Sequence, residues 1–164
     1  MELLRLNHRA YRDHRITTHV ALTARAMGIS KIYYTGQKDS EMEQSVNDVT
    51  KRFGGDFKIE YLENYKPIIK NKKIVHLTMY GLPIEKEIKT IKKHKNILVI
   101  VGGAKVEPEF YTLGYNISVT QQPISEVSAL AIFLYKYNNE KFPKNFKNAK
   151  LKVIPTKIGK LIKQ

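Results

Sequence analysis

Short apolar stretches alternate along the chain with longer stretches in which apolar residues recur at helical spacing. Ile97–Val101 is a run of five aliphatic residues, typical of a strand buried on both faces of a sheet. Ile84, Ile88 and Ile91 instead form a stripe, which predicts an amphipathic helix. The same two patterns predict strands at residues 3–6, 31–34, 57–61, 73–78, 97–101 and 116–119, and helices at residues 17–27, 40–53, 83–94 and 125–137, with a short helical turn at 109–113.

Strands that alternate with helices in this order predict an α/β fold. We expect three layers with a mainly parallel sheet in the middle. Residues 7–16 are polar and rich in arginine, and they are expected to form a loop. No linker or change of composition divides the 164 residues, so one domain spanning residues 1–164 is expected. The basic tail from about residue 140 either adds a strand or stays mobile.

The composition narrows the cellular setting. There is no cysteine, which excludes disulfides and thiolate chemistry and suits a reducing interior. The N-terminal residues lack an apolar stretch of signal-peptide length, and no apolar run approaches the length of a membrane span. These features predict a soluble cytoplasmic protein without a membrane partner.

The charge indicates a polyanionic partner. Lysine and arginine number 29 against 15 acidic residues, which gives a formal net charge of +14 and a pI near 9.8. Five of the six arginines lie in the first 25 residues, and arginine binds phosphate with a planar, bidentate fork. Arg9, Arg12 and Arg15 are therefore expected to bind RNA phosphates. A merely solvated surface is the alternative explanation for the lysine-rich tail.

Glycine or polar residues follow three of the expected strands. Gly102 and Gly103 come directly after the buried strand, residues 77–81 end at a glycine, and residues 120–123 read Thr-Gln-Gln-Pro. Ligands of open α/β sheets bind beyond the carboxyl ends of the strands, so these three segments can converge on one ligand. Taken singly, the glycines can be a tight turn, and Leu77 can be a core residue.

Other catalytic patterns are weak. The five histidines lack the spacing of metal ligands, so no metal site is expected. No Gly-x-Ser-x-Gly segment supports a serine hydrolase. On the helix expected at residues 17–27, His19 and Thr23 share a face, and Arg25 follows; a helical arginine on its own is usually a solvated surface group.

The chain contains three motifs, at Thr17–Gly28, Ile97–Val106 and Asn116–Phe133. Together they resemble the three motifs of the knotted RNA methyltransferases, the SPOUT superfamily, and most closely those of the archaeal tRNA cytidine 2′-O-methyltransferases. The resemblance rests on four segments: Arg5-Leu-Asn-His-Arg-Ala-Tyr-Arg-Asp-His-Arg-Ile-Thr-Thr-His19, His76-Leu-Thr-Met-Tyr-Gly81, Gln122-Pro123, and Ser125-Glu-Val with Ala129-Leu-Ala. It extends from Arg5 to about Tyr135, which is nearly the whole chain without its tail.

The resemblance implies a C-terminal trefoil knot, an exception to the rule that protein chains are unknotted. It also implies a homodimer that binds S-adenosyl-L-methionine in three loops. In this chain those loops contain Leu77, Gly102, Gly103, Ala104, Lys105, Val106, Thr120, Gln121, Gln122, Pro123, Ile124, Ser125, Glu126 and Val127.

The resemblance further implies methyl transfer to a ribose 2′-hydroxyl of tRNA, at the T-loop cytidine in position 56. Ribose-methylating relatives have an asparagine followed six residues later by a catalytic arginine. By that spacing Arg25 is the expected catalytic residue, and His19 takes the place of the asparagine. His19 or a nearby RNA phosphate is the candidate proton acceptor.

Ala104 replaces an acid of the family pattern, Glu107 replaces a proline, and Ile124 replaces a histidine. These changes bear on loop contacts more than on the reaction. Two alternatives remain open at this stage. One is a basic RNA-binding protein without catalysis, which needs no cofactor pocket; the other is a SPOUT methyltransferase that acts on a different nucleotide.

Overall fold

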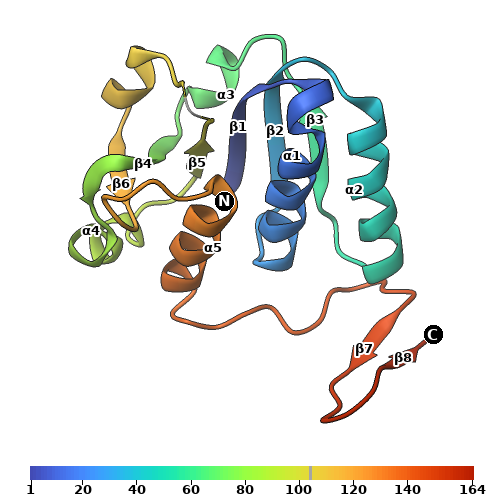
Figure 1. Cartoon of the computed structure of the whole chain (residues 1–164). Helices are drawn as coiled ribbons and strands as arrows, with labels where there is room; N and C mark the ends of the chain where they lie inside the picture. Colours follow the sequence, from blue (N-terminus) through green and yellow to red (C-terminus); the bar gives the residue numbers. More distant parts are fainter. Residues whose placement is uncertain (104) are drawn as a thin grey trace.

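A six-stranded parallel sheet forms the centre of the computed structural model, which describes residues 1–103 and 105–164 (Figure 1). The strands are ordered β3-β2-β1-β5-β4-β6. Every neighbouring pair in this order is parallel. The expected fold class, α/β with a mainly parallel sheet, is confirmed. The strands are β1 (Glu2–His8), β2 (Lys31–Gly36), β3 (Lys58–Tyr61), β4 (Lys73–Pro83), β5 (Ile97–Val101) and β6 (Tyr115–Ser118).

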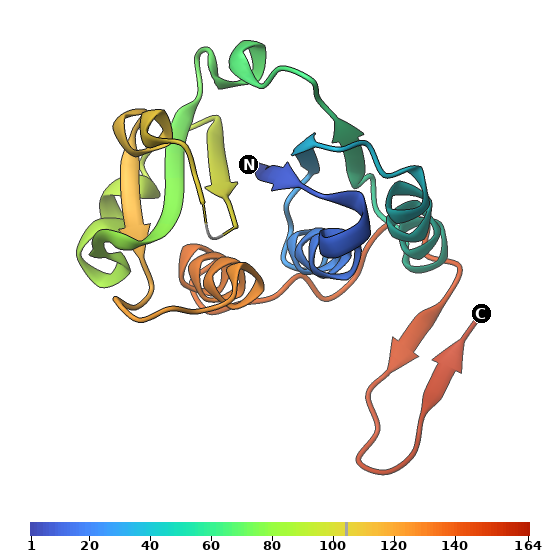
Figure 2. The same cartoon turned by 45° about the horizontal axis from the view of Figure 1, so that its top comes forward.

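Helices cover both faces of the sheet, but unequally (Figure 2). One face carries the long helices α1 (Ala10–Ala26), α2 (Ser40–Phe53), α4 (Ile84–Ile91) and α5 (Glu126–Tyr137). The other carries only the four-residue α3 (Lys66–Ile69) and the 3-10 helix η1 (Pro108–Thr112). The three expected layers are present, and the second helical layer is thin.

Alternate residues of each strand supply two separate cores, because successive side chains in a strand point to opposite faces. In β1, Leu3 packs under the long helices and Leu4 packs under the thin layer. All five residues of β5 are buried because this strand lies inside the sheet with a core on each side. Its unbroken aliphatic character is therefore explained by its position.

The expected loop at residues 7–16 is wrong over most of its length, since α1 begins at Ala10 and the expected start at Thr17 lies two turns inside the helix. The Asp13 carboxylate accepts a hydrogen bond from the backbone N–H of Arg9, at 3.2 Å, and so satisfies a donor at the first turn. Thr17 is buried and hydrogen-bonds the His8 ring instead of capping the helix. The stop at Gly28 is confirmed, with φ of +91°.

The tail after α5 runs back beneath α1 and α2 and ends in a small antiparallel hairpin, β7 (Lys152–Ile154) with β8 (Leu161–Lys163) (Figure 1). Backbone hydrogen bonds attach it to the end of α2: Gly55 N–H donates to Lys147 O at 2.8 Å, and Leu151 N–H donates to Arg52 O at 2.9 Å. Among the described residues no helix is long and apolar enough to cross a bilayer. The single domain stays a prediction.

Candidate functional site

The three expected cofactor segments lie at one edge of the sheet. Two of them follow β5 and β6, and the third is the irregular part of β4 from Leu77 to Gly81. These strands are parallel neighbours in the sheet, so their carboxyl ends meet at the same edge. Both Leu77 and Leu82 of β4 are register partners of Ile117 in β6. Residues 78–81 between them therefore form a bulge in β4. We call this side of the sheet the carboxyl edge.

Gly102 and Gly103 differ in what surrounds them. A Cβ on Gly102 would come 2.2 Å from Cγ2 of Val106, so the loop closes tightly on itself only with glycine there. A Cβ on Gly103 would meet nothing closer than the Arg5 guanidinium, at 4.0 Å. The loop thus presents open backbone at Gly103, which suits the close approach of a ligand.

Arg5 is the buried cation of this edge, and its side chain is only 2% exposed. Its Nη2 lies 3.0 Å from Oε1 of Glu126, the first residue of α5, and its Nη1 donates to the Leu6 carbonyl at 2.6 Å. Its Nε is buried and has no partner among the described residues. Burial lowers the pKa of Arg5, and Glu126 opposes that shift. Since buried polar groups are nearly always hydrogen-bonded, the free Nε indicates a ligand position beside it.

Asn7 joins the end of β1 to the loop after β5. Its backbone has a positive φ of +55°, which asparagine tolerates better than most residues. Its side-chain amide donates to Oε1 of Glu107 at 2.9 Å. The glutamate that replaces the family's proline therefore has a defined partner and ties the loop to β1.

A buried polar cluster extends from the ends of β1 and β2. His8 is fully buried; its Nδ1 lies 2.9 Å from the Thr17 hydroxyl and its Nε2 lies 3.2 Å from Oδ2 of Asp39. The half-exposed His14 shares the same oxygen at 2.8 Å. Burial lowers the pKa of His8, although hydrogen bonding to Asp39 opposes it. The cluster fixes the start of α1 against the start of α2.

The three arginines expected to bind RNA lie on the first turns of α1, next to the carboxyl edge, and all are exposed. Arg9 is half-exposed and forms an ion pair with Asp13, Nε to Oδ2 at 2.9 Å. Arg12, Arg15 and the fully exposed Tyr11 all face solvent on the same first turns of α1. An exposed aromatic among arginines is typical of single-stranded RNA surfaces, where bases stack on rings and phosphates pair with cations.

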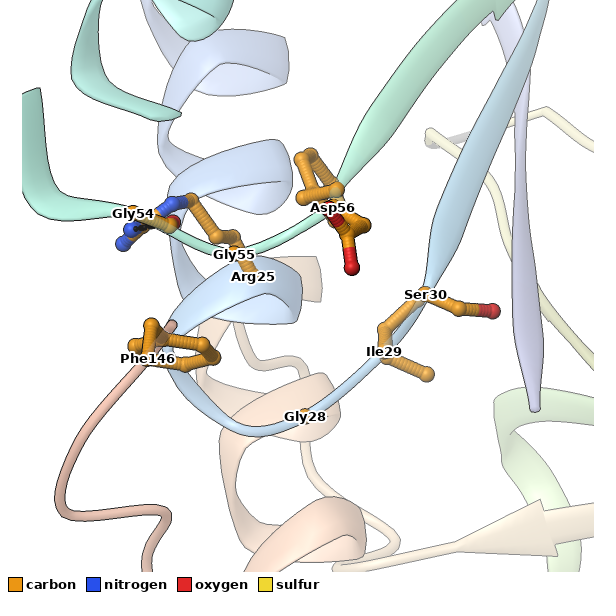
Figure 3. A pocket seen from close by; sticks show the side chains of 9 residues that line it. Arg25, Gly28, Ile29, Ser30, Gly54, Gly55, Asp56 and Phe146 are labelled. Carbon is orange, nitrogen blue, oxygen red and sulfur yellow. Dashed lines mark hydrogen bonds between the residues drawn. The ribbon is translucent and has the colours of Figure 1, made fainter. Parts of the chain in front are cut away.

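Within one chain Arg25, the expected catalytic residue, lies at the opposite edge of the sheet, and its catalytic role stays a prediction. A crossover helix runs antiparallel to its strands, so the C-terminal end of α1 lies beside the amino ends of β2 and β3. There the Arg25 Nη2 donates to the Gly54 carbonyl at 2.5 Å, and its guanidinium stacks on the Phe146 ring at 4.8 Å (Figure 3). These residues line a cavity of about 190 Å³ with Gly28 and Asp56. Within one chain Arg25 cannot reach the carboxyl edge.

His19 is exposed in the middle of α1 and contacts neither the three loops nor Arg25 through any hydrogen bond that the described residues show. The structure therefore does not bring the two expected catalytic residues together.

The remaining expected cofactor residues fall on the carboxyl edge as follows. Leu77 is buried at the β4 bulge, and Glu126 and Val127 open α5, capped by Ser125 whose hydroxyl accepts from the Val127 N–H at 3.2 Å. Lys105, the half-buried Val106 and Thr120, and the exposed Gln121, Gln122, Pro123 and Ile124 belong to the loops. Ala104 lies outside the described residues.

Sequence reasoning did not select Arg5, although a signal was present. A charged residue inside the apolar run Leu3-Leu4-Arg5-Leu6 must be paired if the strand is buried. No group of three or more His, Cys, Asp or Glu side chains in the described part of the chain could hold a metal ion.

The chain is similar in sequence to known proteins. A family profile described as tRNA ribose 2′-O-methyltransferase, aTrm56, matches residues 53–163. A tRNA (cytidine(56)-2′-O)-methyltransferase of Thermococcus kodakarensis is 46% identical over 172 residues, covering 99% of this chain and 96% of the relative. The protein of the same name from Methanocaldococcus jannaschii is 46% identical over 171 residues, covering 99% and 95%.

Solved structures share the fold at low identity. An RNA 2′-O ribose methyltransferase superposes with a TM-score of 0.63 at 13% identity, covering 85% of this chain and 56% of that one. The SpoU methyltransferase AviRb from Streptomyces viridochromogenes, in complex with AdoMet, gives 0.63 at 12%, covering 85% and 57%. This chain thus spans little more than half of either structure.

The sequence matches over nearly the whole chain, together with the shared fold, confirm the resemblance read from the motifs: the chain belongs to the tRNA ribose 2′-O-methyltransferase family.

Proposed function

We propose that the protein transfers a methyl group from S-adenosyl-L-methionine to the ribose 2′-hydroxyl of cytidine 56 in tRNA. The observation that carries the proposal is the 46% identity, over nearly the full length, to a tRNA (cytidine(56)-2′-O)-methyltransferase. The ion pair between Arg5 and Glu126, beside the three loops, is consistent with a site at this edge. The basic start of α1 next to these loops supports RNA as the substrate.

The residues present fit the cofactor. The open backbone at Gly103 and the unpaired Nε of Arg5 provide an approach and a hydrogen-bond donor at the carboxyl edge. Leu77, the loop from Gly102 to Val106 and the segment from Thr120 to Val127 would hold the group. When bound, S-adenosyl-L-methionine supplies a methyl carbon activated by a neighbouring sulfonium.

The chain's own task is to hold the 2′-hydroxyl in line behind that carbon, because alignment of the reacting atoms supplies much of the rate enhancement in such transfers. The arginines of α1 would fix the RNA by its phosphates, and these contacts position the substrate without reading its bases. The exposed Tyr11 ring can stack on an unpaired base of the loop.

We further infer a C-terminal trefoil knot and a homodimer, both from the family resemblance. Return of α5 to the sheet between α1 and α4 after β6 is compatible with the knot. Action on tRNA supports a cytoplasmic location, as does the absence of cysteine.

The decisive experiment incubates the purified protein with unmodified tRNA transcript and S-adenosyl-L-methionine and locates the added methyl group by mass spectrometry of nuclease fragments. One methyl group on the ribose of cytidine 56 is expected. A transcript with 2′-deoxycytidine at that position is the matched control and should accept none. Methylation elsewhere would mean a different nucleotide target, and tight tRNA binding without methyl transfer would mean a non-catalytic RNA-binding protein.

A further inference from the structure

Methylation of a hydroxyl releases its proton, so a base must stand beside the reacting oxygen. Most acidic and histidine side chains near the carboxyl edge are already committed. Both oxygens of Asp13 accept from Arg9, at 2.9 and 3.2 Å. Asp39 accepts from the Met42 N–H with one oxygen and contacts two histidines with the other. Fully buried His8 has both ring nitrogens engaged.

Glu126, Glu107, His14 and His19 remain, and their places in the fold separate them. His19 is exposed in the middle of α1, and no hydrogen bond among the described residues joins it to the three loops. His14 contacts Asp39, which follows β2, on the far side of β1 from the three loops. Glu107 is exposed, and its Oε1 is held by Asn7. Glu126 lies within the third loop segment itself and is held against β1, the neighbour of β5. Its Oε2 has no hydrogen-bond partner among residues 1–103 and 105–164, and its side chain is 21% exposed.

We propose that Glu126 accepts the proton of the ribose 2′-hydroxyl, and that Arg5 is the positioning residue that holds the carboxylate in place. This inference rests on the proposed function. A lone pair of the hydroxyl oxygen forms the new bond to the methyl carbon, the carbon–sulfur bond breaks with its electron pair left on sulfur, and the O–H proton passes to Oε2 of Glu126.

A carboxylate is a sufficient base for this step, because a hydroxyl becomes strongly acidic as its oxygen is alkylated. The proton therefore moves late, and the position of the acceptor matters more than its basicity. The ion pair with Arg5 is made by Oε1 of Glu126, and the side chain stays 21% exposed. The amino end of α5 also favours a negative charge on its first residue. The ion pair holds the Glu126 carboxylate against β1, beside the three loops.

Arg5 is suited to positioning and not to direct contact with the ribose. At 2% exposure its Nη atoms are occupied by Glu126 and by the Leu6 carbonyl. Lysine would preserve the charge but lose the planar fork that holds the carboxylate in one orientation. A change at Arg5 should therefore alter the catalytic rate constant through the placement of Glu126.

The test compares Glu126→Gln with wild type in single-turnover methylation of tRNA, with Glu107→Gln as the matched control on the same edge. Glu126→Gln keeps the size and one oxygen but removes the base, so its rate should fall by roughly 10²- to 10³-fold. Calorimetric affinity for S-adenosylhomocysteine and the affinity for tRNA should stay within about threefold of wild type. Glu107→Gln should remain near the wild-type rate.

Three further variants sharpen the assignment. At saturating S-adenosyl-L-methionine, Arg5→Lys should lower the catalytic rate constant by about tenfold with little change in the KM for tRNA, which a purely structural role would not produce. Formate should partly restore the rate of Glu126→Ala, because it can occupy the vacated position and accept the proton. Should Glu126→Gln melt below the assay temperature, Glu126→Asp keeps the charge but withdraws the carboxylate, and a loss of about tenfold is then expected.

The outcomes separate this inference from the proposed function. A wild-type protein that transfers no methyl group to tRNA contradicts the proposed function. A wild type that methylates cytidine 56 beside an equally fast Glu126→Gln variant overturns only the role of Glu126. Loss of S-adenosylhomocysteine affinity in step with the rate would also overturn it and make Glu126 a cofactor ligand. A large loss in His14→Gln with Glu126→Gln unaffected would assign the proton to the histidine.

Discussion

Replacing Arg25 with alanine should lower stability and leave the chemistry almost intact. The guanidinium donates to the Gly54 carbonyl at 2.5 Å and stacks on Phe146 at 4.8 Å. A hydrogen bond from a charged donor contributes about 1.5–3 kcal/mol. A partly buried cation–π contact contributes about 1 kcal/mol, and the apolar stem about 1.5 kcal/mol. The alanine variant also loses the unpaired buried Nε, and this removal stabilises the folded state by about 1–2 kcal/mol and partly offsets these losses. The net loss is about 3 kcal/mol.

For a chain of this size, a loss of that magnitude lowers the melting temperature by roughly 6–12 °C, which differential scanning calorimetry measures directly. Single-turnover methylation well below the transition should change by less than about threefold. Phe146→Ala should destabilise in the same way. The double variant should lose less than the sum of the two single losses, because both residues belong to one contact.

The opposite result is equally clear. A loss of rate of a hundredfold or more in Arg25→Ala at an unchanged melting temperature would refute the structural role. It would restore Arg25 as a catalytic residue, and the partner subunit's site would then be the only one within its reach. Arg25→Met, which keeps the apolar stem without the charge, is the control that separates packing from the hydrogen bond.

Three further predictions concern the donor loop, the RNA surface and the buried histidine. Gly102→Ala should weaken S-adenosyl-L-methionine binding in calorimetry because its Cβ would lie 2.2 Å from Cγ2 of Val106 and force the loop apart. Gly103→Ala should also weaken binding, because its Cβ would enter the open space through which the cofactor approaches; unchanged affinity in both variants would remove this loop from the site. The double variant Arg12→Ala and Arg15→Ala should weaken tRNA binding and reduce the slope of log affinity against log salt by roughly one per phosphate contact, and an unchanged slope would exclude these contacts. Burial lowers the pKa of His8 below its unfolded value, so the histidine takes up a proton on unfolding; its contribution is present above about pH 6.5 and is lost as pH falls through the folded pKa. Urea unfolding should therefore show stability declining below about pH 6.5, and His8→Gln should flatten that decline.

The elements readable from sequence were those whose buried residues are apolar. The strand β5 and the helices α2 and α5 follow their apolar patterns within a residue or two. The start of α1 was missed because its first buried positions are Asp13 and Thr17. Asp13 is buried there because it forms an ion pair with Arg9. Thr17 is buried because it hydrogen-bonds His8, which belongs to β1 and not to the helix. A pattern of apolar spacing cannot register such positions.

The site was only partly predictable for a related reason. Motif likeness located the three loops, since each follows its strand directly in the chain. Likeness by spacing also selected Arg25, but spacing along a helix does not say at which edge of the sheet a side chain lies. The topology of parallel sheets does, because the end of a crossover helix returns to the amino edge. Arg5 could have been selected by a different argument. A cation in a buried strand needs an acidic partner from elsewhere in the chain, and in the structure that partner is Glu126.

The attachment of the tail at the amino edge limits what the lysine-rich hairpin can reach. Strands of five residues span about 17 Å, so at least that height of sheet separates the attachment at Gly55 from the arginines of the first turns of α1. One subunit therefore presents positive charge at two opposite ends. A tRNA whose ribose lies at one end of the strands cannot be gripped by that same subunit's hairpin unless the RNA extends around the sheet. Shortening the tail after Leu151 should then affect how far along the tRNA the protein protects it, without altering which nucleotide is modified.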